Sequence, residues 1–351
     1  GIPLAPAPTC HIDSDLRVVV VPLNENKKTG RPALLRILPL LAAILCAAWP
    51  AQAQTYPDHP VRIVVGFAAG SGPDIQARTV AQELGSSLGQ QFYVENRLGA
   101  NGTIAARAVA TAAPDGYTLL STSSSIISTP WIYKKLGYDT LNDLRPIATL
   151  GELDGIFMLV DAKSPVKSVA EFIALAKKER LLYGSPGVGN GLHLATEIFA
   201  KKAGIKLQHV PYKGASEVMT ALLGGSINVM FVTPPSVMGL IKEGRVRPLA
   251  FTGTKPFAQA PEVPLMKDLV PGYESQGSWG MMLGPGTLPD DLTNKLNAAV
   301  RKALLVPQVA SIMQRDGYSP DNRDAAATAA FFRKEVMQAE EAVKAAGIEP
   351  N

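Results

Sequence analysis

A short apolar strand meets the start of a helix in the stretch Val61-Arg-Ile-Val-Val-Gly-Phe-Ala-Ala-Gly-Ser-Gly-Pro73. The β-branched run at residues 61–65 predicts a buried strand, and Pro73 is typical of the first turn of a helix, here expected to end near Leu88. Glycines between the two let the backbone approach a ligand closely, and the free N–H groups of a helix start attract anions. This junction predicts an α/β sheet with an anion site at the carboxyl end of a strand.

The same order of strand, turn and helix recurs along the chain. Further strands are expected at residues 91–95, 117–121, 157–160, 182–184, 207–210, 227–232 and 248–251. Helices are expected at residues 103–113, 169–179, 192–203, 215–223, 235–242, 290–305, 307–316 and 323–346. This alternation favours α/β layers with largely parallel sheets.

The chain has 351 residues, which is too long for one small sheet. We expect two sheets joined by short crossings near residues 147–154 and 275–282. The predicted domains are residues 55–153 for the first part of domain 1, 154–276 for domain 2 and 277–351 for the return of the chain to domain 1.

Residues 1–54 are predicted to stand outside the fold. A basic segment at residues 27–36 precedes a 13-residue apolar run, residues 37–49, and then Ala51-Gln-Ala53. This order is typical of a secretory signal peptide that is cleaved after Ala53 or Gln54, with residues 1–30 as an upstream extension. A buried hydrophobic helix is the alternative, and a spanning helix would need ~20 apolar residues. Export places the expected location in the periplasm or outside the cell.

Composition excludes several classes of protein. Lys and Arg number 34 against 30 Asp and Glu, a formal charge of +4 without a basic cluster, so no nucleic-acid partner is expected. Both cysteines, Cys10 and Cys46, fall in the first 54 residues, which excludes a disulfide framework and a CxxC zinc site. No histidine spacing suggests another metal, and no cofactor is expected.

The motifs nearest to catalytic ones are incomplete. Gly187-Val-Gly-Asn-Gly191 has the spacing GxGxG rather than GxGxxG, and no acid follows at the distance a dinucleotide site needs. Ser185 is preceded at the key position by Tyr183 instead of the glycine of a nucleophile elbow. We therefore expect no enzyme, and we keep a hydrolase that uses Ser185 and His193 as the alternative from another class.

Three junctions remain as candidate binding loops, at residues 66–74, 121–125 and 184–193. They combine glycine with Ser, Thr or Asn where a strand gives way to a helix. If the junctions of two sheets open on a common cleft, they form a two-sided trap for a carboxylate or phosphate.

Ordered sequence blocks extend from these loops over nearly the whole chain after residue 54. They include Tyr56-Pro-Asp-His-Pro-Val-Arg-Ile-Val-Val65, Ala113-Pro-Asp-Gly-Tyr-Thr-Leu-Leu120, His209-Val-Pro-Tyr-Lys-Gly214 and Leu222-Leu-Gly-Gly225. The chain resembles the solute-binding proteins of tripartite tricarboxylate transporters, the Bug family of periplasmic receptors.

The resemblance implies an α/β, two-domain periplasmic binding protein of type II (a Venus flytrap) with mixed sheets flanked by helices. It implies a monomer that captures a small organic carboxylate between its domains and delivers this anion to the membrane permease of a tripartite tricarboxylate transporter. Presentation of the liganded receptor to a sensor kinase of a two-component system is the alternative, because both partners would read the same closed form.

The candidate ligand-binding residues come from the three loops and from the two blocks that face them. They are Phe67, Ala68, Gly70, Ser71, Asp74, Thr122, Ser123, Ser124, Ser185, Gly187, Gly189, Asn190, His193, Tyr212, Lys213 and Thr233. The anion is expected on the helix starts after Gly70 and Gly189, with serine hydroxyls as further partners.

Alternative roles stay open for two of these residues. Asp74 could cap its helix instead of facing the ligand, and Lys213 could be a surface residue instead of a cleft cation. The family usually has Pro at position 66 and Gly at position 71, where this chain has Gly66 and Ser71. Val232-Thr-Pro-Pro235 makes one wall less polar than is usual, which points to a ligand with an apolar or aromatic body.

Overall fold

The structure is a computed structural model that describes residues 56–274 and 277–350. The predicted signal peptide, its cleavage point and the upstream extension lie outside the described residues. Within the described part of the chain, every helix is too short or too polar to cross a membrane.

The first sheet has six strands in the order β11-β4-β10-β3-β1-β2. Its strands are β1 (Val61–Val65), β2 (Phe92–Asn96), β3 (Thr118–Ser123), β4 (Leu144–Leu153), β10 (Ser278–Pro285) and β11 (Tyr318–Ser319). The second sheet has five strands in the order β7-β6-β8-β5-β9. These are β5 (Phe157–Asp161), β6 (Leu181–Ser185), β7 (Leu207–Pro211), β8 (Val229–Val232) and β9 (Val246–Phe251).

The two sheets follow one plan. In each, the first strand of a parallel trio lies between the second and the third: β1 between β2 and β3, and β6 between β7 and β8. Beside the third strand lies one antiparallel strand, β10 in the first sheet and β5 in the second. The prediction of mixed sheets is confirmed, whereas the expectation of largely parallel sheets is wrong, because β4, β5, β9, β10 and β11 pair antiparallel. The carboxyl ends of each parallel trio share one edge of their sheet.

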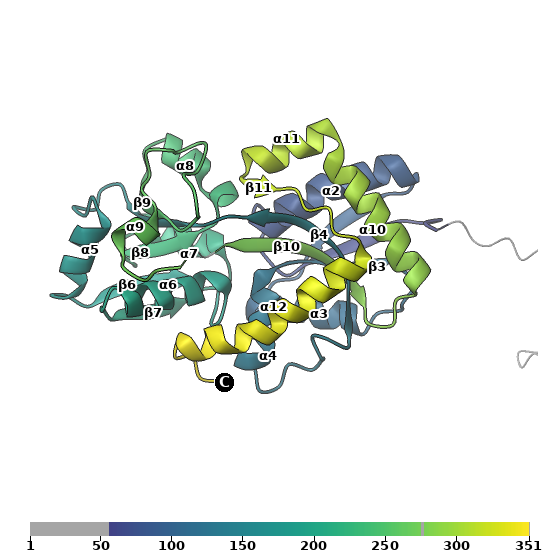
Figure 1. Cartoon of the computed structure of the whole chain (residues 1–351), viewed down its shortest axis with the longest axis horizontal. Helices are drawn as coiled ribbons and strands as arrows, with labels where there is room; N and C mark the ends of the chain where they lie inside the picture. Colours follow the sequence, from purple (N-terminus) through teal and green to yellow (C-terminus); the bar gives the residue numbers. More distant parts are fainter. Residues whose placement is uncertain (1–55, 275–276, 351) are drawn as a thin grey trace, which may run out of the picture. The chain divides into compact units, whose positions relative to one another are not determined.

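Helices cover both faces of the six-stranded sheet (Figure 1). On one face lie α2 (Gly72–Leu88), α10 (Asp290–Leu305) and α11 (Pro307–Arg315), and on the other α3 (Thr103–Ala110) and α12 (Ala325–Ala345). Short elements near the strand ends are η1 (Ala100–Gly102), η2 (Ser124–Ser128) and α4 (Thr129–Ile132).

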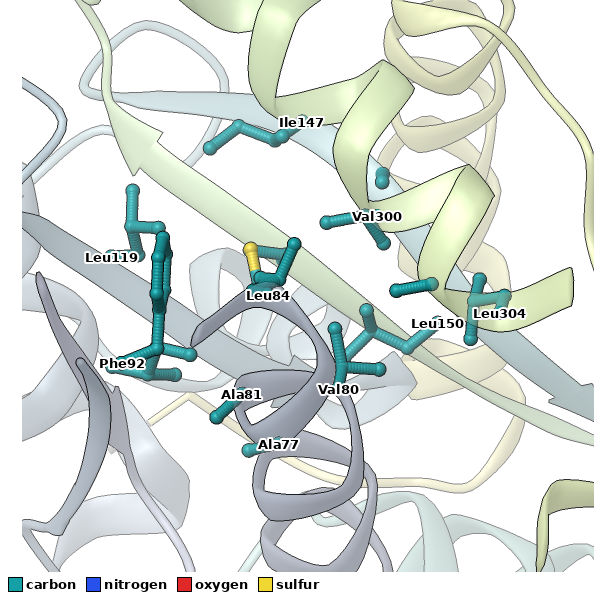
Figure 2. Close-up of a cluster of buried hydrophobic side chains, with 14 of the residues drawn as sticks. Ala77, Val80, Ala81, Leu84, Phe92, Leu119, Ile147, Leu150, Val300 and Leu304 are labelled. Atoms are coloured by element: carbon teal, nitrogen blue, oxygen red, sulfur yellow. The ribbon is translucent and has the colours of Figure 1, made fainter. Parts of the chain in front are cut away.

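The core under α2 explains why this helix forms where it does. Ala77, Val80, Ala81 and Leu84 recur at helical spacing and pack on the sheet, on Phe92 from β2, and on Val300 and Leu304 from α10 (Figure 2). The helix ends at Gly89, whose φ of 74° suits glycine and whose N–H reaches the carbonyl of Gly85. Burial of this stripe fixes the direction of α2 and hence the position of its N-terminus.

The five-stranded sheet has its own cores on its two faces. Its helices are α5 (Val169–Ala176), α6 (Gly191–Lys202), α7 (Ala215–Leu223), α8 (Met238–Lys242) and α9 (Met266–Leu269), with η3 (Pro234–Ser236) after β8. Asn190 caps α6 by accepting a hydrogen bond from the Leu192 amide at 3.0 Å.

Two segments differ from the sequence prediction. Residues 147–154 and 275–282 are expected as crossings between sheets, but most of the first belongs to β4 and most of the described part of the second to β10. The two strands pair with each other over eight positions, Ser278–Pro285 against Leu144–Leu153. The chain passes from the first sheet to the second between β4 and β5 and returns between β9 and β10, so the crossings do lie next to the predicted segments. Their extent is wrong, because most of each segment is a buried apolar strand at the antiparallel centre of the first sheet.

Candidate functional site

A cavity of about 430 Å³ lies among the loops at the carboxyl ends of strands in both sheets. From the first sheet it takes the β1–α2 loop, the start of η2, the ends of β4 and β10, and one side of α12. From the second sheet it takes the β6–α6, β7–α7 and β8–η3 loops. The candidate residues that line it are Phe67, Ala68, Ser71, Ser123, Ser124, Asn190 and Thr233.

The N-terminus of α2 faces this cavity through Ser71, Gly72 and Pro73. The first amides of a helix have no acceptor within the helix, and Pro73 has no amide, so Gly72 and Asp74 supply the first-turn donors. Ser71 is the N-cap residue but makes no capping bond, and its Oγ is buried without a hydrogen-bond partner in residues 56–274 and 277–350. This helix start therefore presents unused donors and a positive dipole end to the cavity.

Asp74 stabilises the β1–α2 loop through hydrogen bonds to its buried carboxylate. Its carboxylate is 2% exposed and accepts hydrogen bonds from the Gly70 amide at 2.9 Å, Arg78 Nε at 3.0 Å and Asn96 Nδ2 at 2.8 Å. Burial opposes the charge, but hydrogen bonds from Arg78, Asn96 and Gly70 outweigh it and lower the pKa of Asp74. The structure places this carboxylate in the loop's support, and it is absent from the cavity lining.

Hydroxyl groups gather where β3 gives way to η2. Ser124 Oγ lies 2.9 Å from Ser278 Oγ of β10, and Ser123 Oγ accepts a hydrogen bond from the Ser125 amide at 3.4 Å. Thr122 is 4% exposed and does not line the cavity. The wall formed by η2 is therefore polar but carries no charge.

The β6–α6 loop of the second sheet contacts loops of the first. Asn190 Nδ2 donates to Asn101 Oδ1 at 2.8 Å, and Ser128 Oγ donates to the Gly189 carbonyl at 2.7 Å. The Gly191 amide donates to Ser125 Oγ at 3.1 Å. These hydrogen bonds join the two sides of the cavity.

A buried stack of rings supports the same loop. His193 and His209 lie face to face with centroids 4.0 Å apart, and Tyr183 stacks on His209 at 4.9 Å. Burial, with a smaller contribution from His209, lowers the pKa of His193 to about 3, and burial lowers the pKa of His209 to about 4. Both imidazoles are therefore neutral at ordinary pH.

Hydrogen bonds of this stack occupy several groups that the sequence assigns to ligand binding. The Gly189 amide donates to His193 Nδ1 at 2.8 Å, so it has an acceptor inside the protein rather than the expected anion. Ser185 is fully buried, and its Oγ lies 2.7 Å from His209 Nε2 and 2.9 Å from the Gly187 carbonyl. Neither Ser185 nor His193 lines the cavity.

The remaining candidates lie at or beyond the rim. Gly70 lines a smaller neighbouring hollow together with Ser71, and Gly187 is outside the cavity lining. Tyr212 packs against the core of the second sheet. Lys213 is exposed, and its backbone amide donates to Glu217.

Several lining residues are absent from the sequence prediction, namely Gln76, Glu152, Trp279, Tyr318, Phe331 and Glu335. Gln76 has a readable signal, because it is a polar residue within the apolar stripe of α2. Glu152 lies near the end of β4, and the return of the chain to the first sheet in β10, β11 and α12 brings the other four to the cavity. Among the residues that the structure describes, no group of three or more His, Cys, Asp and Glu could hold a metal.

Two α/β sheets of equivalent strand order, with a cavity among the loops at their carboxyl ends, define a two-domain solute-binding protein of the periplasmic type. Residues 76–348 match the family model described as the tripartite tricarboxylate transporter family receptor. The chain belongs to this family, as the resemblance predicts. It is 35% identical over 311 residues to the UPF0065 protein in the gbd 5'region of Cupriavidus necator, which covers 88% of this chain and 94% of the relative.

Solved structures agree with this assignment. Periplasmic binding protein BugD is 30% identical with a TM-score of 0.79, covering 84% of this chain and 100% of that one. Rpa4515 of R. palustris, solved with adipate, is 30% identical with a TM-score of 0.80 over 84% of this chain and 100% of that one. MatC from Rhodopseudomonas palustris, solved with bound malate, is 28% identical with a TM-score of 0.76 over 82% of this chain and 100% of that one.

Proposed function

We propose that this chain is a non-enzymatic receptor that captures a small organic carboxylate in the 430 Å³ cavity. The observation that carries the proposal is the start of α2, where Ser71 and Gly72 line the cavity and, within the described part of the chain, Ser71 Oγ has no hydrogen-bond partner. Adipate and malate in two relatives are carboxylates, which supports the same class of ligand here.

Contact with the ligand is assigned to the seven candidates that line the cavity. Ser71, Ser123 and Ser124 provide hydroxyls, Asn190 and Thr233 face them from the second sheet, and the β1–α2 loop provides Phe67 and Ala68. Hydrogen bonds to a charged group contribute ~1.5–3 kcal/mol each, so a few of them give micromolar affinity, about −8 kcal/mol, after the cost of association.

We propose an indirect role for the other candidates. They fix the loops on which the contacting groups stand: Gly70, Asp74, Thr122, Ser185, Gly187, Gly189, His193, Tyr212 and Lys213. Burial of Ser185 speaks against the hydrolase alternative, because a nucleophile must reach its substrate.

The receptor would deliver its ligand to the permease of a tripartite tricarboxylate transporter, after export to the periplasm by the predicted signal peptide. Residues 55–153 and 277–351 would move as domain 1 and residues 154–276 as domain 2, since the two sheets draw their strands from these ranges. Two hydrogen bonds would hold the domains closed around the ligand, one between Asn190 and Asn101 and one between Ser128 and Gly189. The receptor would act as a monomer.

Calorimetry on the chain from residue 55 onward tests the proposal. A panel of mono-, di- and tricarboxylates should give at least one acid that binds with one-to-one stoichiometry and is recovered unchanged. Ser71→Ala should weaken that acid by about tenfold, because it removes one donor to a charged group. Absence of binding to every acid, or turnover of a bound one, would contradict the receptor.

A further inference from the structure

The side chain of Gln76 is a buried amide at the edge of the cavity. Gln76 is 1% exposed and lines the cavity, yet its Nε2 has no hydrogen-bond acceptor among the residues that the structure describes. A buried amide donor without an acceptor is costly, so such groups are rare unless a ligand or water completes them. A leucine at this position would extend the apolar stripe of α2 without that cost.

Two facing glycines make room for this amide. Gly151 of β4 pairs with Gly280 of β10, and a Cβ on Gly280 would lie 1.9 Å from Gln76 Oε1. A Cβ on Gly151 would lie 3.5 Å from Gln76 Nε2 and 3.2 Å from Tyr318 Cβ. The sheet thus has no side chain at the two positions against which the Gln76 amide packs.

Other donors surround the same end of the cavity. A Cβ on Gly72 would lie 2.6 Å from the hydroxyl oxygen of Tyr318 and 3.6 Å from Thr233 Oγ1. Burial, with a contribution from Asp316, raises the pKa of Tyr318, so its hydroxyl keeps its proton. Gln76 therefore lies in the same part of the cavity lining as the hydroxyl groups of Tyr318 and Thr233.

Charge limits what these donors can receive. The charged side chains among the described lining residues are Glu152 and Glu335, and no lysine or arginine lines the cavity. Glu152 is paired with Arg323 at 2.7 Å, whereas Glu335 accepts a hydrogen bond from Trp279 Nε1 at 3.0 Å. A second carboxylate on the ligand would meet these acidic groups without a cation to balance it.

We propose that Gln76 determines ligand specificity by donating a hydrogen bond to an uncharged polar group, such as a carbonyl or carboxamide oxygen, at the far end of a monocarboxylate. This inference rests on the proposed function, with the ligand's carboxylate at the start of α2. Gln76 follows Ser71 by five residues, about 7.5 Å along a helix at 1.5 Å per residue. A six-carbon chain spans this separation.

Three acids that differ only at the far end test the proposal: hexanoate, adipic acid monoamide and adipate. Quenching of Trp279 fluorescence or calorimetry should show that the monoamide binds about tenfold more tightly than either of the other two. Gln76→Leu should abolish the advantage of the monoamide over hexanoate and leave hexanoate within about twofold of its original affinity.

Two further variants make the test decisive. Gln82→Leu changes an exposed residue of the same type on the same helix and should leave all three affinities as they are. Gln76→Glu keeps the shape of the side chain and replaces the donor with an acceptor, so it should also remove the preference for the monoamide if the leucine variant fails to fold. Adipate as the tightest ligand, or an equal preference in the original protein and the Gln76 variants, would overturn the role of Gln76. Failure of all three acids to bind at millimolar concentration, when another acid of the carboxylate panel does bind, would also overturn the role of Gln76. Failure of every acid of that panel would instead overturn the proposed function.

Discussion

Replacement of His193 by asparagine should make the protein less sensitive to acid. In the native fold His193 Nδ1 accepts the Gly189 amide at 2.8 Å, so this nitrogen cannot carry a proton without losing that bond. The other groups that face the ring are His209, stacked at 4.0 Å, Tyr183 at 5.9 Å and Glu197, whose Oε1 lies 3.9 Å from Nε2. Asparagine places Oδ1 where Nδ1 stands and keeps the acceptor without the titration.

The magnitude follows from the pKa of His193, which is 6.5 when unperturbed and about 3 in the fold. Between these two pH values the imidazole of His193 binds a proton in the unfolded chain but not in the native protein. The free energy of unfolding therefore falls as the pH falls. At about pH 4.5 the unfolded imidazole lies two units below its pKa, and the native one is still neutral. At ~1.36 kcal/mol per unit, His193 alone removes about 2.5 kcal/mol between pH 7 and pH 4.5.

Urea denaturation at the two pH values measures this loss. The original protein should lose about 2.5 kcal/mol more than His193→Asn between them. His193→Leu separates the two roles of the ring, because it should show the same reduced pH dependence while losing stability at neutral pH, where the Gly189 amide is left without an acceptor. An equal loss in the original protein and in His193→Asn would refute the reasoning.

Three other substitutions test the loops around the cavity. Gly189→Ala should lower the free energy of unfolding by about 2–4 kcal/mol, because Gly189 has a φ of 73° and an added Cβ would lie 1.8 Å from Ile132 Cδ1. The control is Gly225→Ala, at a glycine with a φ of 74° and open space around it. This variant should lower the free energy of unfolding by only about 1 kcal/mol in the same urea titration. Asp74→Asn should destabilise by about 2–3 kcal/mol at neutral pH, and the difference should shrink as acid protonates the carboxylate, whose pKa is lowered in the fold. Asn190→Ala removes both the cap of α6 and the bond to Asn101, so calorimetry should show ligand affinity reduced several-fold and denaturation a loss of about 1–2 kcal/mol.

Local patterns were sufficient to predict the parallel strands and most helices. The helix predicted at residues 290–305 has the bounds of α10, and the strand predicted at residues 61–65 those of β1. Proline at the helix start and apolar spacing act within a few residues, so the sequence displays them directly. Strands β4 and β10 are not predicted, because each pairs with a strand more than a hundred residues away and local patterns do not show this pairing.

The binding loops are predictable from the same local patterns, but the acceptors of their hydrogen-bond donors are not. Sequence gives the helix starts after Gly70 and Gly189 similar glycine-rich loops. Only the structure shows that the Gly189 amide donates to His193, four residues further on, whose ring stacks on His209 of the neighbouring strand. Gln76 could have been noticed as a polar residue in an apolar stripe, whereas Trp279 and Glu335 reach the cavity through long-range topology alone.

The N-termini of α2 and α6 differ in whether their hydrogen-bond donors have acceptors within the protein. At α6, the amides of Gly189, Gly191 and Leu192 donate to His193, Ser125 and Asn190, so its positive end is satisfied within the protein. At α2, Ser71 Oγ and Gln76 Nε2 have no acceptor in the part of the protein that the structure describes. The two sheets share one strand order but differ in how their hydrogen-bond donors are used. The unused donors belong to the first sheet, whereas the donors of the β6–α6 loop in the second sheet hold that loop in place. An anion should therefore gain most of its binding energy from the six-stranded sheet, and substitutions at Ser71 and Gln76 should change which ligand binds, whereas changes at Asn190 should weaken all ligands alike.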